Sequence, residues 1–455
     1  MGINCEESLF LQDTSSQWCY ADLFLAPFCF EGGFIFNIGL GSGMQLGGNM
    51  ENWVIKNKRA DFKQLSQACG ISEVTARCLV NKGLEKPEEI EAFLNPRLED
   101  MHEPLLMKDM EKALEILKIK IADGKKIRII GDYDVDGVVS TYILYRTLTL
   151  IGANVDYDIP DRIRDGYGIN NRMVEEAHAA QVDTILTCDN GIVATEQVLL
   201  AKSYGMTIII TDHHNLLEND QGEVILPEAD AVINTKRPDC IYPYKCLCGA
   251  GIAYKLVTAL LEFYEIGEKA SYQEELLSYT AIATVCDVMD LTGENRIIVS
   301  HGLRLLKETK NKGLLALIDL CRIDLQQLSA FHLGYIIGPC LNASGRLDTA
   351  RKGLELLLTG SEEEALVLAA QVKELNDVRK EMTADNAGKA FQLIEESNLI
   401  REKVLVVYLP DCHESIAGII AGRVRERYNR PAIVLTGAKD CIKGSARSIE
   451  QYNMI

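Results

Sequence analysis

The chain has 455 residues, 47% of them hydrophobic, and carries a formal net charge of −19. A chain of this length can bury a large core and divides into two or three domains. Its acidity argues against general adhesion to nucleic acid, although it allows a local basic groove. No run of about 18 uncharged residues predicts a membrane span, and fourteen unevenly spaced cysteines indicate reduced thiols and a cytoplasmic protein.

The first 49 residues differ from the rest of the chain. Residues 1–49 contain five acidic residues, no lysine or arginine, and no helical or strand periodicity. A signal peptide needs a basic start, so this interpretation is excluded. Because the sequence from Met50 resembles an ordinary bacterial start, we expect 1–49 to be a non-native segment translated from upstream. Residues 50–120 then alternate helical patterns with polar turns and form an N-terminal helical region.

Strands alternate with helices from residue 125 onward. Helices are expected at Val138–Leu150 and near 172–180 and 194–204, each between apolar β-branched runs. This alternation predicts an α/β fold with a parallel sheet covered by helices, in which ligands bind beyond the carboxyl ends of the strands. Each strand run is expected to end in an acidic residue at this edge, namely Asp132, Asp161, Asp189 and Asp212.

The last hundred residues follow a different pattern. Residues 351–398 read as long amphipathic helices, which we expect to connect two lobes. After residue 402, the strand pattern KVLVVYLP, a helix near 415–428 and the strand pattern PAIVLT begin a second α/β unit.

The segment GDYDVDG concentrates negative charge. It places Asp132, Asp134 and Asp136 at alternate positions of a strand end and the following turn, which Gly131 and Gly137 permit. Each like-charge pair at 4 Å costs about 4 kcal/mol at an effective dielectric constant of 20. Protonation would require pKa values raised by roughly three units. Divalent cations are the less costly solution.

Further acids and imidazoles complete a ligand set for two ions. Asp189, His213 and Asp287 join the three aspartates, and this oxygen-rich set with an imidazole favours Mn²⁺ or Mg²⁺. In the segment TDHH, His213 is interpreted as a ligand, His214 as a donor aimed at substrate, and Asp212 as an acceptor that orients the neighbouring loop.

Simpler interpretations of these segments exist. A lone DxD is commonly a solvated turn, and a lone histidine pair commonly lies on the surface or caps a helix. A calcium-binding EF-hand loop is excluded, because its twelfth position needs glutamate and is Ile143 here. The combination of several acids and histidines at separate strand ends favours a metal centre.

Four segments are similar, in order, to the four motifs of the DHH phosphoesterase superfamily: GDYDVDG, TCDNGI, TDHHN and ATVCDVMDL. Other segments resemble the RecJ family of single-stranded-DNA-specific exonucleases: DRIRDGYGIN, LCGAGIAYKL, GPCLNASGRLDTA, CHESIAGIIAGRVRERYNRPAIVLT and KGSARSI. The resemblance covers residues from about 50 to 455. It implies a DHH catalytic domain at 121–350, a helical connector at 351–400 and a partial DHHA1 domain at 401–455, with DNA running between the lobes.

The resemblance also implies roles for single residues. The positions that match the family's metal ligands, with Asp189 bridging two Mn²⁺ or Mg²⁺ ions, are Asp132, Asp134, Asp136, Asp189, His213 and Asp287. His214 matches a histidine near the scissile phosphate and is a catalytic candidate together with Asp136. Ser445 and Arg447 match the motif for the 5′-phosphate.

Residues that contact the nucleic acid are expected elsewhere as well. Arg346 and Arg447 stand beside small residues that let a backbone approach an anion, although Arg346 could pair with a nearby acid. Arg164 and Tyr167 either pack a loop over the site or stack on a base. His413 stands at an expected helix N-terminus, which favours phosphate.

The function implied is a metal-dependent 5′ to 3′ exonuclease that hydrolyses single-stranded DNA in repair and recombination. Its implied partners are single-stranded DNA, a single-strand-binding protein and a helicase. No association with a membrane is expected. The alternatives are a DHH phosphodiesterase acting on oligoribonucleotides or cyclic dinucleotides and a catalytically inactive DNA-binding scaffold; the complete set of acids disfavours the scaffold.

Two departures from the family pattern qualify this expectation. Ala446 replaces a usual glycine and would restrict the loop if that position needs a positive φ. The chain also ends before the closing DHHA1 motif and the OB-like domain of the family. We therefore expect the metal site to assemble while the grip on the strand is weak.

Overall fold

A computed structural model describes residues 58–219, 221–438, 441–450 and 452–454. The expectations that the protein starts at Met50 and that 1–49 is non-native lie outside the described residues. The chain divides into two compact units, whose described parts are residues 58–97 and the residues from 98 onward.

The smaller unit consists of three short helices around a core of its own. Its buried side chains come from all three helices and include Leu65, Leu79 and Phe93. The helices are α1 (Phe62–Cys69), α2 (Glu73–Lys82) and α3 (Pro87–Leu94).

The larger unit contains a five-stranded parallel sheet in the order β2-β1-β3-β4-β7, as the alternation of strands and helices predicted. Its central strands are buried along almost their whole length because helices cover both faces. The strands are β1 (Ile127–Ile130), β2 (Val155–Asp158), β3 (Thr184–Cys188), β4 (Thr207–Thr211) and β7 (Ala231–Ile233).

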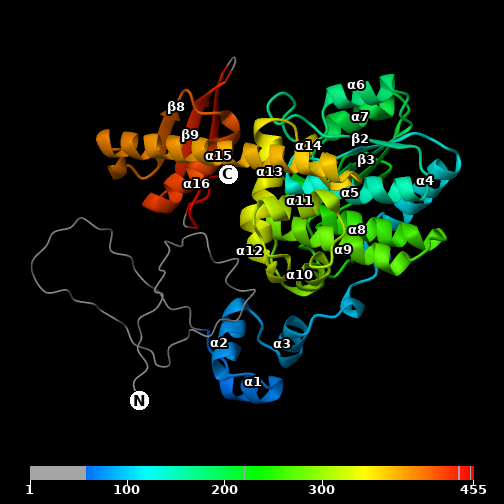
Figure 1. Ribbon diagram of the computed structural model, residues 1–455, viewed down its shortest axis with the longest axis horizontal. Coiled ribbons are helices and arrows are strands. Elements are labelled where there is room, and N and C mark those ends of the chain that lie inside the picture. The colour runs from blue at the N-terminus through cyan, green and yellow to red at the C-terminus, as the bar shows by residue number, and fades with distance from the viewer. Residues whose placement is uncertain (1–57, 220, 439–440, 451, 455) are drawn as a thin grey trace, which may run out of the picture. The chain divides into compact units, whose positions relative to one another are not determined.

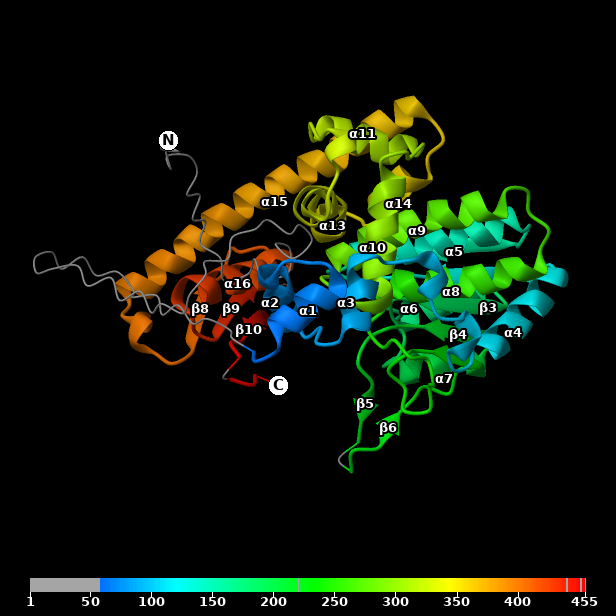
Figure 2. The same cartoon turned by 90° about the horizontal axis from the view of Figure 1, so that it is seen from below.

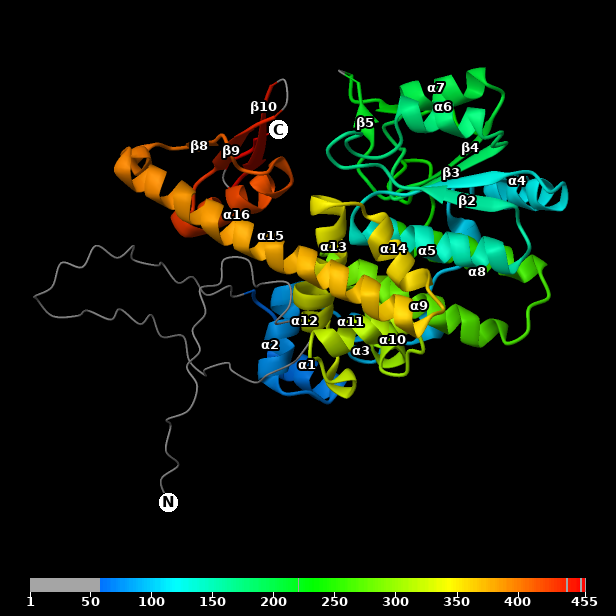
Figure 3. The ribbon, with the colours of Figure 1, turned by 45° about the horizontal axis from the view of Figure 1, so that its top comes forward.

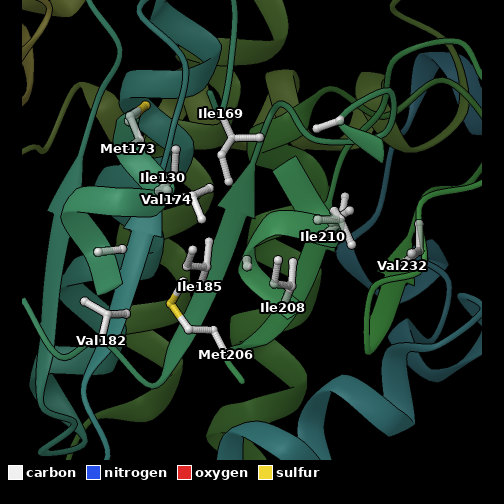
Figure 4. Close-up of a cluster of buried hydrophobic side chains, with 14 of the residues drawn as sticks. Ile130, Ile169, Met173, Val174, Val182, Ile185, Met206, Ile208, Ile210 and Val232 are labelled. Atoms are coloured by element: carbon white, nitrogen blue, oxygen red, sulfur yellow. The ribbon is translucent and has the colours of Figure 1, made fainter. Parts of the chain in front are cut away.

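Helices α6 and α7 cover one face of this sheet, α5 and α8 cover the other, and α9 packs on α5 and α8 (Figure 3). Under α6 and α7 lies a buried cluster that includes Ile130, Met173 and Ile208 (Figure 4). Helix α5 is buried nearly all round because α8 and α9 pack on it from outside. The helices are α4 (Met110–Ala122), α5 (Val135–Leu150), α6 (Asn171–Ala179), α7 (Thr195–Ser203), α8 (Gly249–Leu260) and α9 (Lys269–Cys286).

The remaining elements of this part extend the helical layer (Figure 1). They comprise α10 (Gly293–Leu306), α11 (Lys312–Leu320), α12 (Ala330–His332), the π-helical turn η7 (Leu333–Ile337), α13 (Gly338–Leu347) and α14 (Arg351–Leu358). Short 3₁₀ turns are η3 (Leu98–Asp100), η4 (Pro104–Leu106), η5 (Leu261–Phe263) and η6 (Leu325–Gln327), and a hairpin joins β5 (Leu217–Glu218) to β6 (Val224–Ile225).

One long helix links this layer to a second sheet. Helix α15 (Glu362–Glu396) contacts α11, α13 and α14 and also contacts β8 and α16 (Figure 2). The second sheet has the order β10-β9-β8, and α15 and α16 share its apolar core. Its elements are η8 (Leu399–Arg401), β8 (Leu405–Leu409), η9 (Glu414–Ile416), α16 (Ala417–Tyr428), β9 (Ala432–Gly437) and β10 (Ile442–Arg447).

The turn expected within GDYDVDG is wrong in detail. Helix α5 begins at Val135 rather than Val138, because the Asp134 side chain accepts the N–H of Gly137 and caps the helix. Gly137 therefore lies inside the helix. A Cβ there would meet backbone atoms of Asp132 at 2.4–2.6 Å, so glycine permits a close approach rather than a turn.

The expected position of Asp161 is also wrong. Strand β2 ends at Asp158 on the edge of the sheet, and Asp161 lies in the following loop. Its carboxylate accepts the backbone N–H groups of Ile163 and Arg164 and so stabilises that loop. Among the described helices, none is long and apolar enough to cross a membrane.

Candidate metal centre and phosphate pocket

The carboxyl ends of β1, β3 and β4 bring together residues that are far apart in the sequence. Asp132 follows β1, Asp189 follows β3 and His213 follows β4, while Asp136 stands in the first turn of α5. Helix α9 ends at Cys286 and presents Asp287 to the same place. We call this group the acidic rim, and it consists of Asp132, Asp134, Asp136, Asp189, His213 and Asp287.

Distances within the acidic rim are those of a shared ligand set. The Nε2 atom of His213 lies 3.1 Å from Oδ1 of Asp189, 3.6 Å from Oδ2 of Asp136 and 3.7 Å from Oδ2 of Asp287. The ligand atoms lie within 4.8 Å of one another in each of three groups: Asp189, His213 and His214; Asp136, His213 and Asp287; and Asp132, Asp134 and Asp189.

Backbone donors hold Asp136 in place. Its two carboxylate oxygens accept the N–H groups of Gly249 at 2.6 Å and Ala250 at 2.8 Å, at the start of α8. A helix N-terminus favours a carboxylate because its backbone donors and dipole are positive. A Cβ on Gly249 would lie 2.7 Å from the Cβ of Asp189, so glycine lets α8 approach the rim.

Asp189 stands in a left-handed backbone conformation with φ of 63°. This conformation is unfavourable for a residue with a side chain, and Asp189 N–H is fixed in it by donating to the carbonyl of Thr211. Its Oδ1 is buried without a hydrogen-bond partner. A buried carboxylate oxygen without a donor is costly, so the rim is incomplete as a purely protein structure.

The pKa values of the rim carboxylates also indicate that the rim needs positive charge. Burial, then the charge of Asp134, raises the pKa of Asp132 to about 8. Burial, then the charges of Asp136 and Asp134, raises the pKa of Asp287 to about 8. Burial and neighbouring aspartates also raise the pKa of Asp189. These carboxylates resist ionisation until positive charge is supplied.

His214 is oriented by two neighbours. Its Nδ1 lies 2.8 Å from Oδ1 of Asp212, which also accepts the N–H groups of His213 and His214. The hydroxyl of Tyr167 lies 2.9 Å from the same Nδ1 and donates to the carbonyl of Asp189. Burial opposes protonation, but the Asp212 hydrogen bond together with the charges of Asp212, Asp136 and Asp287 outweighs it and raises the pKa of His214. Asp212 therefore orients the loop, as predicted.

The acidic rim fits divalent cations. It combines carboxylate oxygens with an imidazole nitrogen, includes a buried oxygen that lacks a donor, and has several buried like charges within a few ångströms. Hard divalent ions take such ligands and neutralise such charges.

A second feature lies beside the rim and is basic. We call it the arginine pocket, a cavity of about 440 Å³ whose lining includes four arginines, two glutamates and several small residues: Arg162, Arg346, Arg423, Arg447, Glu414, Glu426, Ser415, Gly418 and Ser445. It draws on the loop after β2, on α13, on α16 and on β10. A Cβ on Gly418 would lie 3.0 Å from the guanidinium of Arg447, so this glycine opens the pocket floor.

Arg346 faces the pocket and is not held by an acid. Its Nη1 donates to the carbonyl of Ser415 at 2.8 Å, and within the described part of the chain it forms no ion pair. Burial, then the charges of Arg162 and Arg379, lowers its pKa to about 10. The alternative that Arg346 pairs with a nearby carboxylate is therefore wrong.

Several predicted contact residues lie elsewhere or act locally. Arg164 points to solvent with 64% of its side chain exposed and binds Asp165, so it does not line the arginine pocket. His413 caps η9, with its Nδ1 2.7 Å from the Ser415 hydroxyl. Ala446 lies in β10 opposite Ile433 and has no positive φ, so the missing glycine causes no strain.

The sequence did not predict that Arg162 and Arg423 line the pocket. The guanidinium of Arg162 lies 4.3 Å from the ring centroid of Tyr133 and lines the pocket. The segment DRIRDGYGIN contains both Arg162 and Arg164, and a loop has no period that assigns one of them to the site. For Arg423, the signal was the three-arginine run of α16, in which only one position faces the cavity.

The comparisons with known proteins agree with this geometry. Residues 126–284 match the family model of the DHH family, N-terminal domain. The fold and the acidic rim therefore define a protein of the DHH class, whose matched region contains the strands β1 to β4 and most of the rim.

Curated relatives narrow the class. The single-stranded-DNA-specific exonuclease RecJ of Bacillus subtilis is 36% identical over 88% of this chain and 50% of its own length. RecJ of Dickeya dadantii is 37% identical over 88% of this chain and 70% of its own length. RecJ of Thermus thermophilus in complex with Mn²⁺ superposes with a TM-score of 0.71 at 28% identity, over 85% of this chain and 53% of that one.

The chain belongs to the RecJ family, because relatives at this level of identity match it over most of its length. It spans about half the length of the Bacillus subtilis relative.

Proposed function

We propose that this chain is a metal-dependent exonuclease that hydrolyses phosphodiester bonds of single-stranded DNA from the 5′ end. We assign residues 121–350 to the catalytic domain, 351–400 to the connector and 401–455 to part of a second domain. DNA repair and recombination are the processes that such an activity serves, and a single-strand-binding protein and a helicase are the partners we expect.

One observation carries the proposal: Tyr133 joins the acidic rim to the arginine pocket. It stands between Asp132 and Asp134 in the chain, its ring lies beneath Arg162, and its carbonyl packs against Gly345, where a Cβ would be 2.3 Å away. A strand with a terminal phosphate in the pocket would therefore run directly onto the rim.

The six residues of the acidic rim would hold the two Mn²⁺ or Mg²⁺ ions that we propose, and Asp189, whose buried Oδ1 lacks a hydrogen-bond partner, would be one of the central ligands. When bound, such ions supply polarisation of phosphoryl oxygens, acidification of water and stabilisation of the leaving oxygen. Asp136 is proposed to be catalytic because two backbone donors fix its orientation at the centre of the rim.

The other residues bind and orient the strand. Because Asp212 holds Nδ1 of His214, the other ring nitrogen is the one we propose donates a hydrogen bond to the scissile phosphate. Tyr167, 44% exposed beside His214, covers the site and offers a ring face to a base. The guanidinium groups of Arg346 and Arg447, with the Ser445 hydroxyl, hold the 5′-phosphate.

A direct assay tests the proposal. A 5′-phosphorylated single strand carrying a 3′ label is incubated with Mn²⁺, with duplex DNA, RNA and a cyclic dinucleotide as comparators. We expect progressively shorter 3′-labelled strands from the single-stranded substrate and loss of that activity in Asp136→Ala. Preferred cleavage of RNA or of the cyclic dinucleotide would replace the proposal with the alternative phosphodiesterase. Unchanged activity in Asp136→Ala would reject the rim as the active site.

A further inference from the structure

The smaller unit contains a helix pair that the proposed exonuclease chemistry does not use. Three residues, Gly70–Ser72, join α1 to α2. Gly70 ends α1 in a left-handed conformation with φ of 65°, and the Ser72 side chain accepts the N–H of Thr75 and starts α2. Figure 1 shows α2 running across the direction of α1. A short glycine-containing turn between two crossing helices is the geometry of a helix-turn-helix motif.

The unit buries one side of α2 and leaves the other open. Ala76, Leu79 and Val80 are at most 3% exposed and form the core with α1 and α3. Glu73, Arg77 and Cys78 are the residues of α2 that are exposed, and Glu73 and Arg77 lie on a flank of its buried face. A rigid helix with an exposed polar face is what a groove-binding element requires.

Charge is distributed unevenly along the chain. Residues 58–82, which contain α1 and α2, have five basic and two acidic residues, a net charge of +3, whereas residues 83–97, which contain α3, have two basic and four acidic residues, a net charge of −2. Residues 98–455 have 39 basic and 54 acidic residues, a net charge of −15. The helix pair is thus a basic segment of an acidic protein, which favours a polyanionic partner.

Contacts place the basic side chains around α2. The backbone N–H of Lys58 donates to the Asn81 side chain at 3.2 Å, and the guanidinium of Arg77 lies 4.4 Å from the Phe62 ring centroid. The segment that enters α1 therefore runs beside the second half of α2. Arg59, Lys63 and Arg77 are exposed there.

We propose that α1 and α2 form a second nucleic-acid site that binds duplex DNA, with α2 in the major groove and Arg59 and Lys63 on phosphates. A helix fits the major groove, which is about 12 Å wide. Single strands are bound through exposed aromatic rings. The two aromatic residues of 58–97 do not offer this: Phe93 is 7% exposed and Phe62 lies under Arg77. Such a site would hold the enzyme at a duplex that carries a single-stranded end.

Binding to a fluorescent blunt 20-base-pair duplex in EDTA, where hydrolysis is prevented, tests this site in the full chain. The variant Arg59→Glu/Lys63→Glu/Arg77→Glu is compared with Lys112→Glu/Lys125→Glu/Lys310→Glu, which changes three exposed lysines outside the unit by the same charge. We expect about tenfold or greater loss of duplex affinity in the first variant. The slope of log affinity against log salt concentration should fall by about two, because each of the two proposed phosphate contacts contributes roughly 0.9. The control should stay within twofold.

The double variant Arg59→Glu/Lys63→Glu guards against local unfolding, because it leaves the Arg77–Phe62 contact intact and should still lose affinity. Affinity for an oligothymidine strand should stay within twofold in both basic-segment variants. Unchanged duplex affinity would overturn the proposal. An equal loss in the control triple variant, or an equal loss of single-strand affinity, would overturn it too, because long-range charge would then explain the effect. The outcome is independent of whether the acidic rim hydrolyses DNA.

Discussion

The acidic rim and the arginine pocket are built on opposite electrostatic terms. The rim collects carboxylates in buried positions, with Asp136 and Asp189 only 2% and 1% exposed, on the ends of strands and helices that the core holds rigid. The pocket collects guanidinium groups from four separate elements around an open cavity. Like charges gather in each site, so the rim favours cations and the four arginines of the pocket favour an anion. A phosphate strand with divalent ions supplies both.

The largest expected effect separates chemistry from binding. Replacing Asp189 with asparagine keeps the shape of the side chain but removes the charge at the centre of the rim. We expect the rate of single-strand hydrolysis to fall at least about 1000-fold, equivalent to roughly 4 kcal/mol of transition-state stabilisation. The matched control is Asp183→Asn, at the amino end of the same strand β3, where Asp183 pairs with Lys120. A rate within tenfold of wild type for Asp189→Asn would contradict the assignment.

Removing the cation tests, without any substrate, whether an ion bound at the acidic rim stabilises the fold. Because an ion that binds only the folded state stabilises it by mass action, Mn²⁺ at one hundred times its dissociation constant should add about 2.7 kcal/mol to the free energy of unfolding. Thermal unfolding in EDTA and in Mn²⁺ measures this difference. We expect Asp189→Asn to lose most of the gain and Asp183→Asn to keep it. An equal gain in all three proteins would place the ion elsewhere.

The pocket should govern affinity more than rate. Arg447→Ala and Arg346→Ala should each raise KM for a 5′-phosphorylated strand about tenfold or more, since a charge-assisted phosphate contact is lost. A strand with a 5′-hydroxyl should be affected much less. Arg162→Ala should behave like the pocket variants, whereas Arg164→Ala should change KM less than twofold, because Arg164 is solvent-exposed and paired with Asp165. Equal effects from Arg162 and Arg164 would refute the described pocket.

A further prediction concerns the stability of the loop that carries both Arg162 and Tyr167. Asp165, 4% exposed, accepts hydrogen bonds from Arg172 and Arg164; although burial opposes ionisation, these bonds hold its pKa well below the ordinary value of 3.8. We expect Asp165→Asn to lower the free energy of unfolding at pH 7 by about 2 kcal/mol.

The pH dependence of that difference has a defined sign. A depressed pKa stabilises the folded state above the unfolded value and loses this contribution as pH falls through the folded value. The gap between wild type and Asp165→Asn should therefore be constant above pH 5 and shrink below 3.8. Urea titrations across this range measure it. A gap that grows on acidification would contradict the ion pair as its cause.

The parts of the site that the sequence predicted share one property. Asp132, Asp189 and His213 follow buried strands, so parallel pairing alone brings them to one edge of the sheet. Asp161 failed this rule because β2 ends three residues earlier, at the edge of the sheet. Arg162, by contrast, could not be distinguished from Arg164, since two arginines in an irregular loop have no period that assigns a face.

The sequence by itself determined the alternation of strands and helices, the carboxyl edge as the site, and most of the residues of the acidic rim. These follow from local periodicity and from residues next to strand ends, both of which are written along the chain. Only the tertiary structure decided that Asp136 is held by the start of α8, that Tyr133 joins rim to pocket, and that Arg346 meets Ser415. Gly249 and Asp136, for example, are 113 residues apart, and such contacts depend on how packed elements face one another. No local pattern encodes that orientation.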